Sequence, residues 1–223
     1  MPKLRPALPL LGLLLLAACG LQPIEVRHGP VAGFTPAASP NAPPVAVEAR
    51  EMQPVDRVRY GTSFNGSPVD RRIGFPVSND VAAELREAVT GALRQRGLAV
   101  IAADAALLRL DLAIEEADAV ARTVQRGPPT MTMVSTGPAS FMMVPVASME
   151  TTTTTNFAVQ AVLRDRAGAT RFSRRYEHAA TRVPGMTELN TTVTRAGLEE
   201  GLRSVVRQIA EDPDLIRAIV AAR

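Results

Sequence analysis

Strict alternation of side chains over residues 108–115 is the feature that most limits the fold of this chain. The two alternating sets are Leu108, Leu110, Leu112 and Ile114 on one side, and Arg109, Asp111, Ala113 and Glu115 on the other. Because successive side chains of a strand point to opposite faces, this pattern predicts a strand with one face in a core and one in water. Half-buried strands are typical of antiparallel sheets, so other elements must cover the apolar face.

A helical stripe precedes that strand. Its apolar residues recur at helical spacing: Val81, Leu85, Val89 and Leu93. Ser78 or Asn79 is the expected N-cap, because a short polar side chain there accepts a hydrogen bond from the first helical turn. Gly97 lies where a left-handed residue is expected after the helix, and a short strand is expected over residues 98–102.

Two more helices are expected at the end of the chain. The first spans about residues 190–211, and its apolar stripe consists of Leu198, Leu202, Val205, Val206 and Ile209. Asp212 and Pro213 then predict a break and a new helix, since Asp is a good N-cap and Pro suits the first helical position. The apolar face of this last helix consists of Leu215, Ile216, Ile219 and Val220.

Further strands complete a sheet. Residues 45–52 alternate loosely after two prolines and predict the first strand, while the irregular residues 53–77 predict a long loop with short extended pieces. Residues 157–163 and 169–180 predict two strands joined by a turn over residues 165–168. The order of elements predicts an α+β fold, in which a mostly antiparallel sheet carries two or three helices on one face.

Cys19, the only cysteine, ends a short apolar run that is typical of an export signal. The run is rich in Leu and Ala and follows basic residues. Its last residues, Leu-Ala-Ala-Cys, match the lipobox of bacterial lipoproteins, so we expect residues 1–18 to be a signal peptide cleaved between Ala18 and Cys19. Cys19 would then carry a diacylglycerol thioether with fatty acids such as palmitate.

The alternative is an uncleaved membrane helix that ends at Cys19 by chance. A membrane-spanning helix needs about 20 apolar residues, and this run has about half that length. Exported proteins also rarely keep a lone thiol, because their cysteines usually pair. Two or three acyl chains would hold the protein firmly on a membrane, whereas one chain alone binds only marginally.

The rest of the chain is expected to form a tether and one domain. Residues 19–44 hold Cys19 and a Pro-rich stretch that predicts a flexible tether, and residues 45–223 predict a single domain. The net charge of +3 falls to about +1 when Lys3 and Arg5 leave with the signal peptide. A near-neutral chain lacks the basic surface that nucleic-acid binding requires, so no nucleic-acid partner is expected.

No catalytic, cofactor or metal site is expected. His28 lies in the predicted tether, and His178 lies near a strand end, where an exposed histidine is the simplest interpretation. A nucleophilic triad needs a positioned base, and the chain has no Gly-x-Ser-x-Gly motif and no histidine or cysteine cluster with zinc spacing. Glu115, Glu116 and Asp118 are interpreted as a solvated strand end, with acid–base chemistry or calcium binding as the alternatives.

A Met- and Thr-rich segment over about residues 127–150 is an expected insertion in the domain. It contains five of the eight methionines: Met131, Met133, Met142, Met143 and Met149. A mobile loop or an extended hairpin arm is the first interpretation, and an adaptable apolar contact surface is the second, because Met suits such surfaces. Copper(I) binding is the third, since thioethers are soft ligands, although no His or Cys lies nearby.

Three stretches of the chain resemble the YajG family of bacterial lipoproteins. They are the lipobox with its Pro-rich leader, residues 85–112 around Arg96-Gly97-Leu98, and the ending over residues 205–216. The resemblance implies an anchored lipoprotein that faces the periplasm, and it implies no catalytic residues because the family has no assigned activity. The Met-rich segment has no counterpart in that family. A looser similarity extends to LptE and to the auxiliary lipoproteins of ABC-type transport systems.

We therefore expect a non-enzymatic lipoprotein of the outer membrane that faces the periplasm and acts as a binding or assembly module. Gly20 follows Cys19 in place of the Asp that typically retains enterobacterial lipoproteins at the inner membrane. The expected partners are the membrane, through the lipid on Cys19, and an envelope protein, which would contact the Met-rich segment or a sheet edge. The alternatives are an accessory subunit of an envelope lipid or lipopolysaccharide transport system and, third, an enzyme.

Overall fold

The computed structural model of the chain describes residues 24–30, 33–36, 42–52, 69–72, 77–137, 140–183 and 190–222. The predicted signal peptide, its cleavage site between Ala18 and Cys19, and the lipid attachment site lie outside the described residues. The elements of the described part are β1 (Val45–Glu51), β2 (Val69–Arg72), α2 (Val81–Gln95), β3 (Leu108–Gly137), β4 (Ser140–Asp165), β5 (Thr170–Arg182), α3 (Asn190–Glu211) and α4 (Pro213–Ala221).

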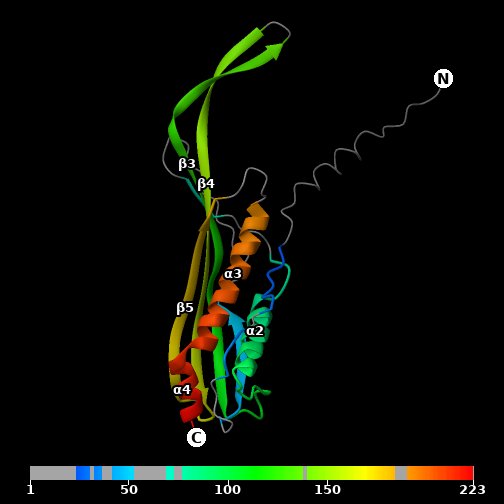
Figure 1. Cartoon of the computed structure of the whole chain (residues 1–223), viewed down its shortest axis with the longest axis vertical. Helices are drawn as coiled ribbons and strands as arrows, with labels where there is room; N and C mark the ends of the chain where they lie inside the picture. Colours follow the sequence, from blue (N-terminus) through cyan, green and yellow to red (C-terminus); the bar gives the residue numbers. More distant parts are fainter. Residues whose placement is uncertain are drawn as a thin grey trace, which may run out of the picture.

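The strands form one mixed sheet in the order β1-β3-β4-β5, and β2 pairs with β3 beyond the end of β1. β2, β4 and β5 are antiparallel to their neighbours. β1 is parallel to β3, because α2 returns the chain to the end of the sheet where β1 begins. The predicted α+β fold with a mostly antiparallel sheet is confirmed (Figure 1).

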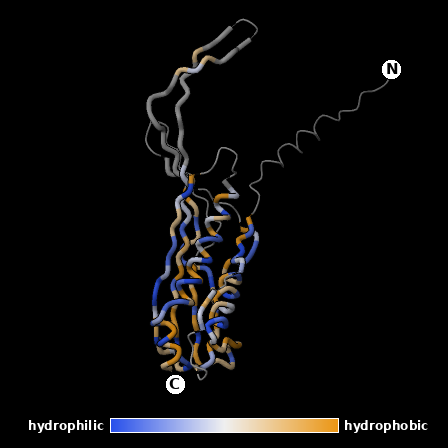
Figure 2. Tube along the Cα trace, in the orientation of Figure 1, coloured by the Kyte–Doolittle hydropathy of each residue, from blue (hydrophilic) through white to orange (hydrophobic). Residues whose placement is uncertain are grey.

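The three described helices cover one face of the sheet, as predicted (Figure 1). The alternating apolar residues of β3 face these helices, and all four are buried: Leu108, Leu110, Leu112 and Ile114. The tube in Figure 2 follows the same division, with hydrophobic positions gathered where sheet and helices meet. Within the described residues, none of the helices combines the length and the apolar character that a membrane span requires. We call this helix-covered part of the domain the body.

The structure confirms one local prediction around α2 and corrects two others. The N-cap of α2 is Asp80, whose side chain accepts a hydrogen bond from the Ala83 N–H, and not Ser78 or Asn79. Gly97 follows the helix with a φ of 84°, as predicted for a left-handed residue. The strand predicted over residues 98–102 is reduced to one bridge between Val100 and Val45, because the chain there turns from α2 into β3.

The predicted flexible tether is wrong for the part that the structure describes. Ile24 forms a bridge with Val77 just ahead of α2, and Val26 is only 1% exposed. The Asn79 side chain accepts a hydrogen bond from the Val26 N–H at 3.0 Å and donates one to the Val26 carbonyl at 2.7 Å. These contacts attach residues 24–30 to the N-terminal end of α2. The prediction of a tether rested on the Pro-rich composition and overlooked Ile24 and Val26, which are buried.

Two glycines let α3 lie unusually close to β4. They are four residues apart on the same side of the helix, at positions 197 and 201. A Cβ atom on Gly201 would lie 2.7 Å from the Cβ of Phe157, and one on Gly197 would lie 2.5 Å from the Thr155 side chain. Real Cβ atoms essentially never approach so closely, so glycine at these two positions sets the distance between the helix and the sheet.

Replacing Gly201 with alanine is therefore expected to destabilise the fold. Helix propensity alone favours alanine by about 1 kcal/mol, but the clash with Phe157 is expected to outweigh this gain by about 1–2 kcal/mol. Urea-induced unfolding measures the difference. Gly91→Ala in α2 is the matched control, since a Cβ there meets nothing within 4 Å, and it is expected to stabilise the protein. Equal gains at both positions would contradict the close contact.

Candidate functional site

A two-stranded ribbon extends beyond the body and carries the Met-rich segment (Figure 1). It is the continuation of β3 and β4, which stay paired from Leu108↔Asp165 in the body to Gly137↔Ser140. The pairing of β2 ends at Thr123, and the pairing of β5 ends at Thr153. Beyond these points, β3 and β4 pair only with each other in the part of the chain that the structure describes. We call residues 127–137 and 140–149 the arm.

The base of the arm is marked by an irregularity in the ladder. The register shifts between Arg126 and Thr130, and the residues between them include Pro128 and Pro129. Proline has no N–H to donate, so these positions interrupt the ladder, and extra residues of this kind bend a strand and increase its twist. The extended hairpin predicted as one form of this segment is thus confirmed, and it continues the central strands of the sheet.

Methionine side chains are exposed on one side of the arm. Met133 lies directly opposite Met143 in the ladder, and Met131 lies two residues before Met133 on the same strand, so all three share one face. Their side chains are 57% exposed at Met131, 64% at Met133 and 51% at Met143. These thioethers form an apolar surface that the body does not cover.

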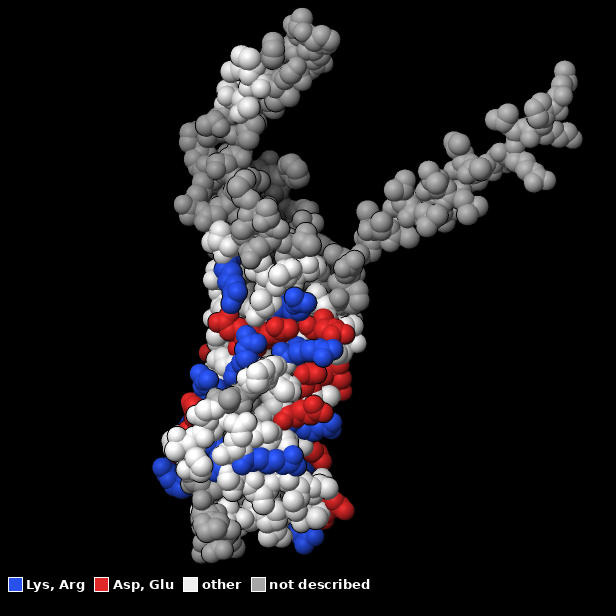
Figure 3. Space-filling model, turned by 45° about the vertical axis from the view of Figure 1, so that its right-hand side comes forward, with Lys and Arg blue, Asp and Glu red and all other residues white. Residues whose placement is uncertain are grey.

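The arm also carries no charge. This absence is visible in the sequence, but the prediction of a contact surface rested on the methionines alone. No Lys, Arg, His, Asp or Glu occurs between Arg126 and Glu150. The body by contrast is densely charged on the face shown in Figure 3, and the described atoms of the arm are uncharged there. Large exposed apolar surfaces typically mark contacts with proteins or membranes, so the arm is the strongest candidate for a functional surface.

Threonines replace apolar residues where the body meets the arm. Thr153, Thr155 and Thr194 are all buried between β4 and α3. Thr155 donates to the Ala180 carbonyl, but the hydroxyl groups of Thr153 and Thr194 have no hydrogen-bond partner among the described residues. A buried polar group without a partner costs about 1–3 kcal/mol, so this junction is less strongly stabilised than the apolar core below it.

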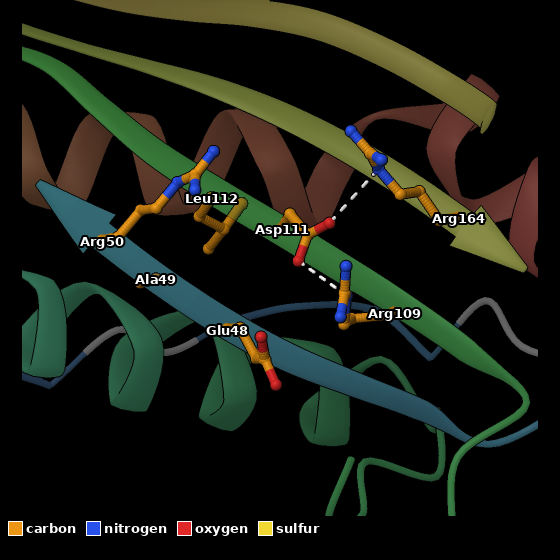
Figure 4. Close-up of a pocket in the computed structure, with 7 residues that line it drawn as sticks. All are labelled: Glu48, Ala49, Arg50, Arg109, Asp111, Leu112 and Arg164. Atoms are coloured by element: carbon orange, nitrogen blue, oxygen red, sulfur yellow. Dashed lines mark ion pairs between the residues drawn. The ribbon is translucent and has the colours of Figure 1, made fainter. Parts of the chain in front are cut away.

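The outer face of the sheet, opposite the helices, contains a shallow hollow of about 350 Å³ (Figure 4). It is lined by Glu48, Ala49, Arg50, Arg109, Asp111, Leu112 and Arg164. Asp111 forms ion pairs with Arg109 at 2.9 Å and with Arg164 at 3.4 Å. Exposed ion pairs of this kind are worth about 0–1 kcal/mol each, and the hollow carries cationic and anionic side chains together.

The acidic group that the sequence placed at a strand end lies within β3. The register shift between Ile114 and Glu116 brings an additional carboxylate to the outer face. Arg175 of β5 forms ion pairs with both Glu115 and Glu116, and Asp118 accepts a hydrogen bond from the Asn156 amide at 2.9 Å. In the described residues, no group of three or more His, Cys, Asp or Glu side chains is placed to hold a metal ion. The partners of these carboxylates, Arg175 and Asn156, lie about 40 to 60 positions away in the sequence. The periodicity of the sequence therefore could not predict these contacts.

Both histidines differ from their predicted settings. His28 is held in place, because its N–H donates to the Glu84 carboxylate and its Nδ1 lies 2.6 Å from the Gly29 carbonyl. His178 is half-buried and not exposed, and its ring lies 3.7 Å from the Cβ position of Gly201 on α3. Its buried Nε2 has no hydrogen-bond partner among the described residues. His28 precedes β1 and His178 lies in β5, and among the described residues neither belongs to a group of three or more side chains that could hold a metal ion.

A buried polar cluster fastens α4 to β5. Asp212 caps α4 by accepting hydrogen bonds from the N–H groups of Asp214 and Leu215. Its other carboxylate oxygen accepts from the Tyr176 hydroxyl and from Arg174, each at 2.6 Å. Arg174 also donates to Asp214 at 2.8 Å. The prediction that Asp212 and Pro213 start a new helix is confirmed, and the structure adds the strand residues that hold this turn.

The protonation states of the cluster suit a structural role. Burial would raise the pKa of Asp212, but hydrogen bonds from Tyr176 and from the N–H groups of Asp214 and Leu215, with the charge of Arg174, outweigh it and lower that pKa. Burial and the hydrogen bond to Asp212 raise the pKa of Tyr176. At neutral pH, Asp212 is thus a fixed acceptor and Tyr176 a fixed donor.

Comparisons with known proteins return partial structural likenesses. No family model matches the chain, and a comparison with curated proteins finds no match. A protein from Xanthomonas campestris assigned to family DUF330 is 12% identical, with a TM-score of 0.45 over 83% of this chain and 89% of that chain. A candidate lipoprotein from Caulobacter crescentus is 15% identical, with a TM-score of 0.36 over 61% and 81% of the two chains. A minor lipoprotein from Acinetobacter baumannii is 14% identical, with a TM-score of 0.37 over 81% and 92%.

At these identities and TM-scores the likenesses assign the chain to no family and no function. Two of these three proteins are described as lipoproteins, and the three descriptions do not name the YajG family. The resemblance to that family therefore stays a prediction.

The Asp212 cluster predicts a stability that depends on pH. A carboxylate whose pKa is lower in the folded than in the unfolded state stabilises the fold above its unfolded pKa, about 3.9, and this contribution is lost as the pH falls through the folded pKa. Asp212→Asn is therefore expected to cost about 1–3 kcal/mol at pH 7. The difference from the parent protein is expected to shrink below about pH 4.

Urea unfolding at several pH values measures this difference. Asp104→Asn is the control, because Asp104 is exposed in the turn before β3, and this change is expected to leave the free energy of unfolding unaltered. A cost for Asp212→Asn that stays constant from pH 7 to pH 3 would show that the ionised carboxylate does not stabilise the fold.

Proposed function

We propose that the chain is a lipoprotein anchored in the outer membrane through Cys19, and that its domain acts in the periplasm as a non-enzymatic binding or assembly module. The lipobox supports the anchor, and Gly20 at the next position supports sorting to the outer membrane. The observation that carries the binding role is the uncharged arm, whose three exposed methionines lie beyond the body.

The proposal that the chain is not an enzyme rests on how its described polar groups are used. Asp212 is an N-cap and an ion-pair partner, and Glu115 and Glu116 are paired with Arg175. Groups that perform acid–base chemistry are instead expected to have a pKa near the working pH and access to a reacting molecule. The arm has apolar side chains suited to contact and none suited to proton transfer.

The second hypothesis is an accessory subunit of an envelope lipid or lipopolysaccharide transport system. It would be supported by an apolar groove between the helices and the sheet. Two hollows in the described part of the chain are lined largely by charged or short side chains, on the outer face and at the β4–β5 turn. Recovery of a transport subunit among the crosslinked partners of the chain would support this hypothesis.

The anchor predicts that Cys19→Ser releases the protein from membranes. The parent protein is expected to float with membranes in a density gradient and to incorporate labelled palmitate, because its Cys19 carries acyl chains. The Cys19→Ser variant is expected to incorporate no palmitate and to remain at the bottom of the gradient. Palmitate labelling that persists in this variant would contradict the assignment of Cys19.

The binding role predicts that the arm is close to another envelope component in intact cells. Lys3 is the only lysine and would leave with the signal peptide, so amine-reactive crosslinkers are unsuitable. A photoreactive residue at position 133 in the lipidated chain is expected to give a discrete adduct with a protein or a lipid. The same residue at Ala167, which is exposed in the β4–β5 turn at the other end of the sheet, is the control. Equal and weak labelling at both positions would contradict a docking role for the arm.

A further inference from the structure

We propose that the methionine face of the arm docks on the lipid surface of the membrane that holds Cys19. This inference names the partner of the arm and rests on the proposed lipidation of Cys19. The docking surface consists of Met131, Met133 and Met143, and the occupant is the interfacial region of the bilayer, where headgroups meet acyl chains.

The first argument is the short length of chain between the lipid and the body. Ile24 is already fixed to the body through its bridge with Val77 and its burial in the core. Four residues lie between Cys19 and Ile24, which makes five steps along the chain, and each step spans at most about 3.6 Å. Cys19 therefore lies within about 18 Å of Ile24. The expected long tether would have lifted the domain clear of the membrane, whereas this short connection keeps the body beside it.

The second argument is the end of the body to which this connection is attached. Val100 and the start of β3 lie near the C-terminal end of α2, so the N-terminal end of α2 lies towards the end of the body from which β3 and β4 continue. Ile24 and Asn79 lie at that N-terminal end, because Ile24 bridges Val77 and Asn79 comes two residues before Val81, where α2 begins. The described chain that follows Cys19 therefore begins at the end of the body from which the arm extends. A membrane held close to this end by the lipid would lie on the same side of the body as the arm.

The third argument is chemical complementarity. A charged side chain is costly to move out of water, and the arm has no charged residue between Arg126 and Glu150. Methionine is flexible and polarizable, which suits it to a fluid and irregular apolar surface. Three such side chains are exposed on one face of the ribbon.

The backbone places the contact at the interface and not in the hydrocarbon. Along the arm, β3 and β4 have no third strand beside them in the described part of the chain, so the outer edges of the arm carry backbone N–H and C=O groups without strand partners. Such groups are costly in hydrocarbon, where water cannot satisfy them. A ribbon that lies in the interfacial region inserts its methionines while its edges remain hydrated.

Fluorescence quenching in vesicles tests this docking. The full chain, produced with its own signal so that Cys19 is acylated, is reconstituted in vesicles of phosphatidylcholine and phosphatidylethanolamine that contain a lipid with a doxyl quencher. Because Cys19 is the only cysteine, Met143→Cys then supplies a single free thiol for the environment-sensitive dye NBD. Ala167→Cys supplies the control position. The label at 143 is expected to shift its emission to the blue and to lose intensity with the quencher, and the label at 167 is expected to change in neither respect.

Charge substitutions separate the two faces of the ribbon. Met133→Asp is expected to abolish the quenching of the label at 143, because it places a charge directly opposite that position. Thr132→Asp is the matched control, and it is expected to leave the quenching unaltered. All these positions are exposed, so both variants are expected to keep the thermal unfolding midpoint of the parent.

Several outcomes would overturn the inference. If the chain floats with the vesicles but the label at 143 is no more quenched than the label at 167, the anchor stands and the docking is wrong. A protein adduct at position 133 in cells, together with unquenched fluorescence in vesicles, would identify a protein or a second copy of this chain as the partner. If mass spectrometry finds Cys19 without lipid, the proposed anchor fails, and the inference fails with it.

Discussion

The backbone ladder between β3 and β4 is the interaction on which the rest of the structure depends. β3 also pairs with β1 and β2, and β4 also pairs with β5, so this ladder joins every strand of the described sheet. The same ladder continues past the helices and forms the arm. The arm is therefore not a separate unit. Its position and twist are set by strands whose apolar face is buried in the body, which lets a two-stranded ribbon persist where an isolated one would be marginal in water.

The helices pack on one face of the sheet that this ladder holds together, and the opposite face carries charged side chains. Gly201 lets α3 approach β4 closely, and Asp212 holds the turn into α4 against β5. The outer face is covered by ion pairs such as Arg175 with Glu115, which keep it hydrated and contribute little stability. Towards the arm the core becomes polar, with Thr153 and Thr194 buried. The molecule thus changes from an apolar core, through a polar junction, to an uncharged arm.

The period of apolar residues predicted the helices and the core strands, since Leu108 to Ile114 and the α3 stripe have clear spacings. It did not predict the length of β3, because the arm has no buried face to impose alternation. The attachment of residues 24–30 to the body was not predicted for a similar reason, because Ile24 and Val26 are only two apolar residues in a Pro-rich stretch. The neutralisation of the acidic group depends on Arg175, whose proximity is created only by the fold.

Amide hydrogen exchange along the arm tests the central claim most directly, because it reads each strand without a label or a substitution in the arm itself. The lipidated chain in vesicles is compared with the Cys19→Ser chain in solution. The account predicts slower exchange over residues 130–137 and 140–146 in vesicles, with unchanged exchange in β5, which lies in the body. Equal exchange in the arm under both conditions, while the lipidated chain remains bound to the vesicles, would contradict a membrane-docked arm.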